Sequence, residues 1–423
     1  MDKNRLKSVI IEQNAYLRKK DTGFPREALD MITPKLRLKH NIVITGPRRS
    51  GKSTLLLQIM RTSLKEDVYH FLRFDDERLL HFNADDFNLL HECFLEIHGE
   101  RGLFIFDEIQ NIKGWERFVN RMYEQGARFL LTGSNANLLS TELSTLLTGR
   151  HIDFELYPFS FGEFLRARDF TFAVDDLLVT PRRARLNALF ADYLDSGGYP
   201  EFLLQGDPQI LQALFTDMVT KDIILRHAVR ESKAIRELAG YLVSNVATSV
   251  SYNALRKTYG LGSSHTVRNY MGYFREVYLF FEVPLFAWSL KRQAVNKRKV
   301  YVIDNGLARA NGFAFSENTG RRLENLVFLE LKRRGLDIYY HKGAHECDFI
   351  VKQGTAVTGA IQVAAQLDEK SRPREVRGLC EALDLYKLDE GTILTVDHKE
   401  EFKAGGKTIR VIPAPEWILT AHR

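Results

Sequence analysis

Short apolar runs alternate with amphipathic stretches between residues 41 and 157. The runs are rich in β-branched and aromatic residues, and polar residues or glycine follow each one before apolar residues recur at helical spacing. This alternation predicts a parallel sheet whose strands are joined by helices. The expected strands are Asn41–Thr45, Val68–Phe74, Leu103–Phe106, Arg128–Thr132 and Ile152–Tyr157.

Helical spacing dominates the next part of the chain, from residue 160 to about residue 230, where Gly197–Pro200 interrupts the pattern. From residue 233 to residue 303 we expect three helices, two of them over Tyr252–Thr258 and Ser264–Phe281. Two short strands should follow, around Leu285 and Val300. Three helices and a β-hairpin are typical of a winged helix-turn-helix.

The last part of the chain, from about residue 318, predicts a separate α/β domain. No run in the whole sequence approaches the roughly 20 apolar residues that span a bilayer, so no membrane partner is expected. The expected helices of this last domain are Asn318–Arg334 and Arg374–Lys387, and its expected strands are Asp337–His341, Glu346–Lys352, Val357–Val363 and Gly391–Val396.

A glycine-rich motif, G-x-x-x-x-G-K-[ST], lies between the first expected strand and an apolar helix. In this context glycines let backbone N–H groups turn towards phosphates, and the helix N-terminus adds partial positive charge. Lys52 would neutralise the β- and γ-phosphates, and the Ser53 hydroxyl would coordinate magnesium. The motif therefore predicts a site for ATP and Mg²⁺. Its residues are Gly46, Pro47, Arg48, Arg49, Ser50, Gly51, Lys52, Ser53 and Thr54.

Two acidic residues, Asp107 and Glu108, follow the apolar strand Leu103–Phe106. A buried strand would bring Asp107 to its carboxyl end, where the carboxylate would hold magnesium together with Ser53. Glu108 would orient and activate the attacking water. A strand that ends in a solvated acidic turn is the alternative, and the glycine-rich motif in the same chain favours the catalytic interpretation.

Two further residues are candidates for the same site. The Asn135 amide would hydrogen-bond the γ-phosphate and the lytic water, or it could belong to a capping turn at the start of a helix. Arg150 would act as an arginine finger, in its own subunit or on a neighbouring one, because a guanidinium suits the spread charge of a transferring phosphoryl group. An ordinary surface arginine is equally compatible with the sequence around Arg150.

Taken together, these segments resemble bacterial and archaeal AAA+-type ATP-binding proteins that carry a winged helix and a C-terminal restriction-endonuclease-like domain. The resemblance covers most of the chain and implies ATPase activity in a mobile multidomain protein; it places Asn135 at the position of the first AAA+ sensor. Besides the P-loop, the segments that carry it are Phe106–Gln110, Thr132–Asn135, Leu147–Arg150, Leu156–Phe161, Gly197–Pro200 and Lys221–Ile224.

The fold class that we predict is α/β with four domains, as the length of 423 residues allows. The first is an AAA+-like P-loop ATPase core with a parallel sheet and an N-terminal helix, and the second is a helical lid or linker. A winged helix-turn-helix and an endonuclease-like α/β domain follow. The predicted boundaries are 1–158, 159–232, 233–303 and 304–423.

Endonuclease-like folds hold a metal ion with a helix glutamate, a strand aspartate, and a Glu/Gln-x-Lys motif on the next strand. The resemblance assigns these places to Glu324, Asp348 and Gln362, but Ala364 stands where the lysine is expected. Without that ammonium the developing charge is not supported, so we expect a nuclease fold without nuclease chemistry. A lysine from elsewhere, such as Lys352 or Lys370, is the alternative.

The formal net charge of +6 favours polyanionic partners, and basic residues gather in the expected wing. They would contact DNA phosphates, although a solvated or protein-binding surface is the alternative. Three cysteines, Cys93, Cys347 and Cys380, are too widely spaced for a disulfide framework or a metal site, which favours the cytoplasm. The basic residues are Lys291, Arg292, Lys297, Arg298 and Lys299.

We therefore predict a Mg²⁺-dependent ATPase whose nucleotide state controls a winged helix and an inactive nuclease-like domain, acting on DNA. One alternative is a STAND-like signalling ATPase that binds protein partners, and another is an ATP-regulated, metal-dependent nuclease. A homo-oligomer is expected if Arg150 acts on a neighbouring subunit. Intact Lys52, Ser53, Asp107 and Glu108 argue against a binding module without hydrolysis.

Overall fold

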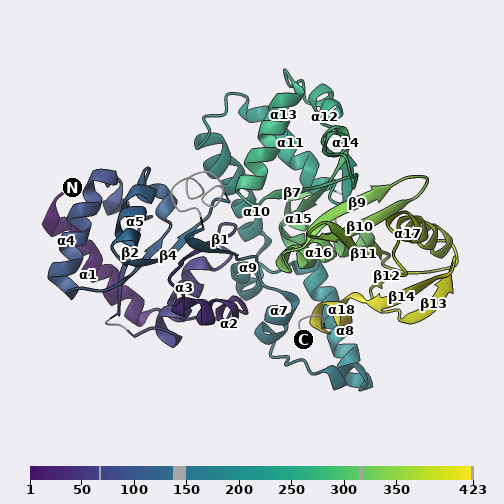
Figure 1. Ribbon diagram of the computed structural model, residues 1–423, viewed down its shortest axis with the longest axis horizontal. Coiled ribbons are helices and arrows are strands. Elements are labelled where there is room, and N and C mark those ends of the chain that lie inside the picture. Colours follow the sequence, from purple (N-terminus) through teal and green to yellow (C-terminus); the bar gives the residue numbers. More distant parts are fainter. Residues whose placement is uncertain (66–67, 137–148, 314–317, 421–423) are drawn as a thin grey trace. The chain divides into compact units, whose positions relative to one another are not determined.

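A computed structural model of the chain describes residues 1–65, 68–136, 149–313 and 318–420 (Figure 1). The chain divides into two compact units. The first comprises Met1–Tyr157 and Glu276–Tyr278, and the second comprises Pro158–Arg275 and Leu279–Arg423. Two of the three predicted domain boundaries fall inside the second unit, so the division into four domains stays a prediction. Leu147 and Thr148 of the predicted motif before Arg150 lie outside the described residues.

A five-stranded parallel sheet forms the centre of the first unit, in the order β2-β3-β4-β1-β5. Thr45 pairs with Gly133, and Arg73 pairs with Asp107, so the carboxyl ends of neighbouring strands lie at one edge of the sheet. All five predicted strands are confirmed: β1 has the predicted bounds, and the ends of the other four differ by at most two residues. Their bounds are β1 (Asn41–Thr45), β2 (Tyr69–Arg73), β3 (Leu103–Asp107), β4 (Arg128–Gly133) and β5 (His151–Glu155).

Helices cover both faces of this sheet (Figure 1). Phe104 and Phe106 belong to one buried cluster, whereas Ile105, between them, belongs to the other. Because successive side chains of a strand point to opposite faces, a strand covered on both sides must be continuously apolar. The helices are α1 (Lys3–Lys19), α2 (Ala28–Ile32), α3 (Lys52–Thr62), α4 (Phe87–His98) and α5 (Trp115–Glu124), with 3₁₀ turns η1 (Thr33–Arg37), η3 (Glu77–Leu79), η4 (Ala84–Asp86) and η5 (Ile109–Asn111).

The second unit begins with helices and continues into a small antiparallel sheet, in the order β6-β8-β7. Gly197 and Gly198 separate α8 from α9, as the break in the sequence pattern predicts. The helices are α7 (Phe161–Ala167), η7 (Val174–Leu177), α8 (Thr180–Ser196), α9 (Pro200–Gln205), α10 (Pro208–Asp217), the π-helix η8 (Met218–Leu225), α11 (Ser232–Ser244), α12 (Tyr252–Thr258), α13 (Ser264–Glu276), α14 (Leu290–Val295) and α15 (Asn305–Asn311). The strands are β6 (Thr248–Val250), β7 (Phe280–Pro284) and β8 (Arg298–Val302).

The end of α13 differs from the prediction, which extended this helix to Phe281. Helix α13 ends at Glu276 because Tyr278 adopts a left-handed backbone conformation, with φ of +63°. The Leu279 N–H then bonds back to the Phe274 carbonyl at 2.8 Å, which is the pattern of a Schellman motif. Glycine is the usual residue at this position, so the apolar periodicity contained no signal for the end of the helix.

The last part of the second unit contains a six-stranded mixed sheet, in the order β13-β14-β12-β11-β10-β9 (Figure 1). The sequence pattern did not predict β13 and β14, which form a hairpin around Gly405 and Gly406. The strands are β9 (Asp337–Lys342), β10 (Glu346–Gln353), β11 (Ala356–Val363), β12 (Glu390–Thr395), β13 (Glu400–Ala404) and β14 (Lys407–Pro413), and the helices are α16 (Thr319–Arg333), α17 (Arg372–Tyr386) and α18 (Ala414–Thr420).

Among the described residues, no helix combines the length and the apolar character that are needed to cross a membrane. The winged helix-turn-helix and the endonuclease-like fold of the second unit stay predictions.

Candidate functional site

The glycine-rich segment Gly46–Ser53 connects β1 to α3 at the carboxyl edge of the parallel sheet. Gly46 has φ of +147°, and a Cβ atom there would lie 2.2 Å from the Leu156 carbonyl oxygen. Gly51, with φ of +96°, directly precedes the first residue of α3. These two positions require glycine for different reasons, a close backbone approach at Gly46 and a left-handed turn at Gly51. The segment therefore presents the N-terminus of α3 as an anion-binding surface.

Lys52 is 4% exposed, and its ammonium group is satisfied by neutral acceptors of its own loop. The Nζ atom donates to the carbonyl oxygens of Gly46, at 3.0 Å, and Pro47, at 2.9 Å. A carboxylate oxygen of Glu108, Oε1, lies 3.9 Å from the same Nζ atom. Phosphate oxygens are stronger acceptors for an ammonium group than backbone carbonyls are, so this arrangement suits exchange of the loop contacts for a ligand.

The Ser50 hydroxyl is buried without a hydrogen-bond partner in the described residues, although a buried polar group ordinarily has one. The backbone around it is held by Arg26, which donates to the carbonyl oxygens of Ser50, at 2.5 Å, and Tyr157, at 2.8 Å. An unpartnered hydroxyl, a buried ammonium and a helix N-terminus fit a triphosphate. Arg26 lies 20 positions before Gly46 and outside the glycine-rich motif, so the sequence pattern did not reveal this contact with the loop.

Asp107 and Glu108 lie at the carboxyl end of β3, as predicted. The Asp107 carboxylate is 1% exposed and accepts hydrogen bonds from the hydroxyls of Thr132 and Ser53. Burial raises the pKa of Asp107, the neighbouring Glu108 raises it further, and the two hydroxyls oppose the shift. Ser53 and Asp107, the predicted magnesium ligands, are therefore brought together by the fold.

Glu108 has a left-handed backbone conformation, with φ of +55°, which is rare for a non-glycine residue. Its N–H donates to Thr132 Oγ1 at 3.0 Å, and its carboxylate accepts a bond from Gln110 Nε2. Gln110 also donates to Ser134 Oγ at 3.2 Å. Thr132 of β4 thus holds the Glu108 backbone, and Gln110 of η5 orients the Glu108 side chain. The sequence assigned neither role.

Asn135 and Arg150 occupy different ends of the sheet. Asn135 follows the carboxyl end of β4, and its Nδ2 atom donates to Glu276 Oε1 at 2.7 Å. Arg150 precedes β5 and bonds to Asn120 and Glu124 of α5, at 3.0 and 3.1 Å. Because β5 and β1 are parallel, Arg150 lies at the opposite edge from the P-loop of its own chain. A role for Arg150 in a neighbouring subunit stays a prediction.

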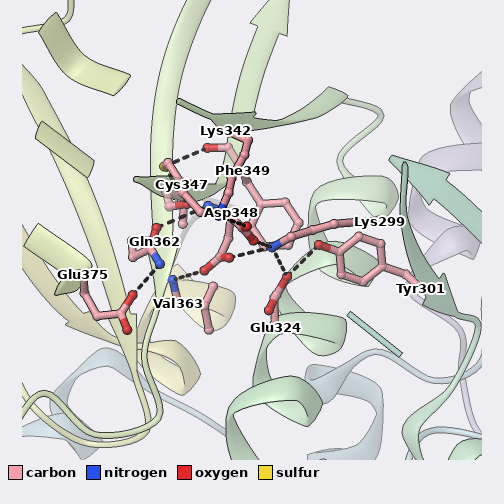
Figure 2. A network of polar contacts seen from close by, with 12 residues as sticks. Lys299, Tyr301, Glu324, Lys342, Cys347, Asp348, Phe349, Gln362, Val363 and Glu375 are labelled. Carbon is pink, nitrogen blue, oxygen red and sulfur yellow. Dashed lines mark hydrogen bonds and ion pairs between the residues drawn. The ribbon is translucent and has the colours of Figure 1, made fainter. Parts of the chain in front are cut away.

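A second buried polar site lies in the C-terminal part of the chain. Glu324 of α16, Asp348 of β10 and Gln362 of β11 are brought together, as the resemblance implied, and they line a cleft of about 470 Å³. Figure 2 shows that Lys299 of β8 enters the same cluster. Its Nζ atom lies 2.7 Å from Asp348, 2.8 Å from Glu346 and 2.9 Å from Glu324.

The three ion pairs of Lys299 are with carboxyl groups, and Figure 2 shows those with Glu324 and Asp348. Burial alone would lower the pKa of Lys299, but Asp348 and Glu324 outweigh burial and hold the pKa well above its ordinary value. Tyr301 donates to Glu324 at 2.7 Å, and the Val363 N–H donates to Asp348 Oδ2 at 3.0 Å. The carboxylates are therefore occupied by an ammonium and by N–H and O–H donors.

Both polar atoms of the Gln362 side chain form hydrogen bonds with protein groups. Its Nε2 atom donates to Glu375 at 2.5 Å, and its Oε1 atom accepts from the Asp348 N–H at 3.2 Å. In the part of the chain that the structure describes, no group of three or more His, Cys, Asp or Glu side chains is arranged to hold a metal ion. The three cysteines are free thiols.

Two relatives match this chain over most of its length. The protein MJ1544 of Methanocaldococcus jannaschii, described as uncharacterized, is 33% identical over 446 residues, covering 99% of this chain and 96% of the relative. The chain belongs to the MJ1544 family. A second relative in this family, an uncharacterized protein of Haemophilus influenzae, is 31% identical over 391 residues, covering 89% of this chain and 94% of the relative.

Two domain families match parts of the MJ1544-family chain. An AAA domain matches residues 39–165, and a domain of unknown function, DUF8612, matches residues 187–317. The predicted AAA-type P-loop domain is thereby confirmed, together with the parallel sheet of the first unit. Among solved structures, the Aeropyrum pernix ORC1 protein in complex with DNA is 15% identical, with 72% of this chain and 92% of that chain covered at a TM-score of 0.28. At this TM-score the likeness has no bearing on function.

One predicted DNA contact of this MJ1544-family protein requires correction. Lys299 was grouped with the exposed basic residues of the wing, but it is 2% exposed because three carboxylates hold its ammonium group. It cannot reach a phosphate backbone from this position. Of the other four residues, Lys291, Arg292 and Lys297 are exposed, and Arg298 is half-buried beside Glu282.

The lysine in the C-terminal site is Lys299, whereas the sequence suggested Lys352 or Lys370 as alternatives. Lys352 pairs with Asp337 at 3.7 Å, and Lys370 is exposed. Ala364 is buried and bonds through its backbone to β12. Lys299 was missed because it precedes Asp348 by 49 positions, and no local spacing connects β8 to β10.

Proposed function

We propose that this protein binds ATP with magnesium and hydrolyses ATP in the site formed by Gly46–Ser53, Asp107 and Glu108. The observation that carries the proposal is the contact between the buried Asp107 carboxylate and the Ser53 hydroxyl beside the buried Lys52 ammonium. These are the groups that phosphoryl transfer requires at one point in space. The match of the AAA domain supports the same proposal.

Each residue of the site has a role that follows from its position. Backbone N–H groups of the P-loop and the Lys52 ammonium would hold the β- and γ-phosphates. Ser53 and Asp107 would hold magnesium, which when bound offsets the negative charge of the phosphates. Glu108, oriented by Gln110 and Thr132, would accept a proton from the attacking water.

The test is steady-state ATP turnover of the purified full chain, together with ATP binding. Glu108→Gln should bind ATP and lose turnover by at least about 100-fold, since the amide cannot accept the proton. Lys52→Ala should weaken both binding and turnover. Lys113→Ala, which removes an exposed lysine of the same unit, is the matched control and should behave as the wild type. Wild-type turnover that survives in both site variants would refute the proposal.

We further propose that the nucleotide state controls the predicted winged helix, and that this region binds DNA. Support comes from the exposed residues Lys291, Arg292 and Lys297, which lie on α14 and directly before β8 without an acidic neighbour in sequence. Phosphate contacts of this kind weaken with salt because bound counterions are released. A signalling ATPase that binds protein is the rival function, and stimulation of ATP turnover by DNA separates the two.

The DNA proposal is tested by affinity for a duplex as a function of salt concentration. Replacing Lys291, Arg292 and Lys297 by alanine should lower the affinity at low salt and reduce the salt slope by about three. A variant with Lys370→Ala and Lys403→Ala removes exposed lysines elsewhere in the second unit and serves as the control. Affinity that does not change with salt concentration would count against DNA as the ligand.

For the C-terminal domain we propose a nuclease-like site without nuclease activity. The support is the Lys299 ammonium, which occupies the carboxylates that a catalytic metal ion would need. Cleavage of supercoiled DNA in the presence of Mg²⁺ or Mn²⁺ is the test, and no cleavage is expected from the wild type. Metal-dependent cleavage that is lost in Asp348→Ala would instead make Lys299 a participant in nuclease chemistry.

A further inference from the structure

Three residues of the first unit, Glu276–Tyr278, come from a distant part of the sequence. They follow α13 and precede β7, and the residues up to Arg275 and from Leu279 belong to the second unit. The segment is sharply bent at Tyr278, where φ is +63°. The chain thus leaves one unit, contributes three residues to the other and returns.

Glu276 contacts the segment that follows β4 through both its side chain and its backbone. Its Oε1 atom accepts a bond from Asn135 Nδ2 at 2.7 Å, and its carbonyl oxygen accepts a bond from the Ala136 N–H at 2.8 Å. Glu276 is 7% exposed. Two bonds from one buried residue hold both the backbone and the side chain of this segment.

The bond to Glu276 also determines which way the Asn135 amide faces. A carboxylate only accepts hydrogen bonds, so the nitrogen of the amide must face Glu276 and its oxygen must face away. A charged acceptor also polarises the amide and strengthens its other hydrogen bonds.

Tyr278 holds the same segment against the neighbouring strand. Its side chain is 1% exposed, and its hydroxyl lies 2.8 Å from Thr45 Oγ1 and 3.4 Å from Glu155 Oε1. Thr45 is the last residue of β1 and directly precedes Gly46 of the P-loop. Glu276 and Tyr278 therefore contact the ends of β4 and β1, which are adjacent in the sheet.

We propose that Glu276 is a positioning residue for Asn135 in ATP hydrolysis. The Glu276 carboxylate fixes the orientation of the Asn135 amide. The amide can then hydrogen-bond to the γ-phosphate and the attacking water in a single orientation. This inference rests on the proposed ATPase function.

The experiment compares kcat and KM for ATP in Asn135→Ala, Glu276→Ala, Glu276→Gln and the double variant Asn135→Ala/Glu276→Ala. Glu276→Ala should lower kcat by about tenfold and leave KM within about twofold, since the P-loop contacts remain. Asn135→Ala should lower kcat by about 100-fold, and the double variant should fall no further, because the two residues act as a unit.

Glu276→Gln separates positioning from a merely structural role. Its amide oxygen still accepts a bond from Asn135, so this variant should keep most of the wild-type kcat. Glu237→Ala, an exposed carboxylate of α11, is the control for loss of a negative charge in this region. Thermal unfolding and ATP binding of each variant show that it is folded.

The outcomes distinguish this inference from the proposed function. A wild-type protein without ATP turnover would refute the proposed function. Wild-type turnover with an unchanged kcat in Glu276→Ala, or losses that multiply in the double variant, would refute the role of Glu276 alone. A Glu276→Gln variant as impaired as Glu276→Ala would also contradict it.

Discussion

Two buried lysines of this protein lie beside carboxylates, and their surroundings differ. Lys52 donates to two neutral carbonyl oxygens of its own loop and lies 3.9 Å from a Glu108 oxygen. Lys299 lies within 2.9 Å of three carboxylates from two different elements. Both ammonium groups are charged donors, but ionised acceptors attract an ammonium more strongly than neutral carbonyl oxygens do. An ammonium held by carbonyls can be released to a phosphate, whereas one held by three carboxylates is retained.

The comparison predicts its largest effect for removal of Lys299. Lys299→Ala leaves buried carboxylates without their counter-charge and should lower the free energy of unfolding by about 3–5 kcal/mol. Urea denaturation of the full chain measures this change in the free energy of unfolding. Lys352→Ala removes a lysine that pairs at 3.7 Å with the exposed Asp337, and it should cost less than about 1 kcal/mol. A loss below 1 kcal/mol in Lys299→Ala would mean that the cluster does not depend on the ammonium.

A divalent cation should partly replace the missing ammonium. In Lys299→Ala the oxygens of Glu324, Glu346 and Asp348 become available as hard ligands, which Mn²⁺ and Mg²⁺ prefer. At 100 times its dissociation constant a cation stabilises the folded state by about 2.7 kcal/mol. Nucleotide-free Lys299→Ala should therefore gain thermal stability on addition of Mn²⁺ relative to the wild type.

The control for the cation effect is the double variant Lys299→Ala/Asp348→Asn. Loss of one carboxylate should abolish most of the gain, because the amide oxygen is a weaker ligand. Equal stabilisation of the wild type and Lys299→Ala by Mn²⁺ would place the cation elsewhere. It would contradict the comparison between the two lysines.

The variant Arg26→Ala tests whether a buried cation that is held by carbonyl oxygens contributes to the free energy of unfolding. Its guanidinium is 4% exposed and bonds to the carbonyl oxygens of Ser50 and Tyr157. Arg26→Ala should cost about 1–3 kcal/mol of unfolding free energy, since two buried acceptors lose their partner. It should also raise the KM for ATP, because the P-loop backbone is less constrained. An unchanged KM would limit Arg26 to a structural role.

The smallest effect on stability is expected for Lys52. Lys52→Met removes an ammonium that donates to two neutral backbone carbonyls, and it should change the free energy of unfolding by less than about 1.5 kcal/mol. Its effect on ATP turnover should be far larger, as proposed above. A stability loss as large as that of Lys299→Ala would show that Lys52 is a structural cation and would remove the contrast between the two sites.

Much of the first unit could be predicted from the sequence because its signals are local. Each strand of the sheet is a continuous apolar run, as a strand covered on both faces requires. The P-loop motif occupies consecutive positions between β1 and α3, so its residues are adjacent by chain connectivity alone. Asp107 was predicted because it ends an apolar strand in a chain that already carries the motif.

Other features depended on contacts between distant positions. The Gly405-Gly406 turn was a local signal for the β13–β14 hairpin that sequence reasoning did not use. The end of α13 at Tyr278 had no such signal, because a tyrosine rarely adopts the left-handed conformation. The partners of Lys299 and Glu276 lie 25 or more residues away, and charge in the sequence does not reveal burial.

The sequence by itself determined the parallel sheet and the phosphate-binding loop, since strand periodicity and glycine conformations are properties of short segments. Only the tertiary structure decided that Lys299 belongs to a buried carboxylate cluster rather than to an exposed basic surface, and that Glu276 faces Asn135. The reason is electrostatic: a charged side chain is placed by its most favourable buried partners, and these come from elements that meet only when the chain folds.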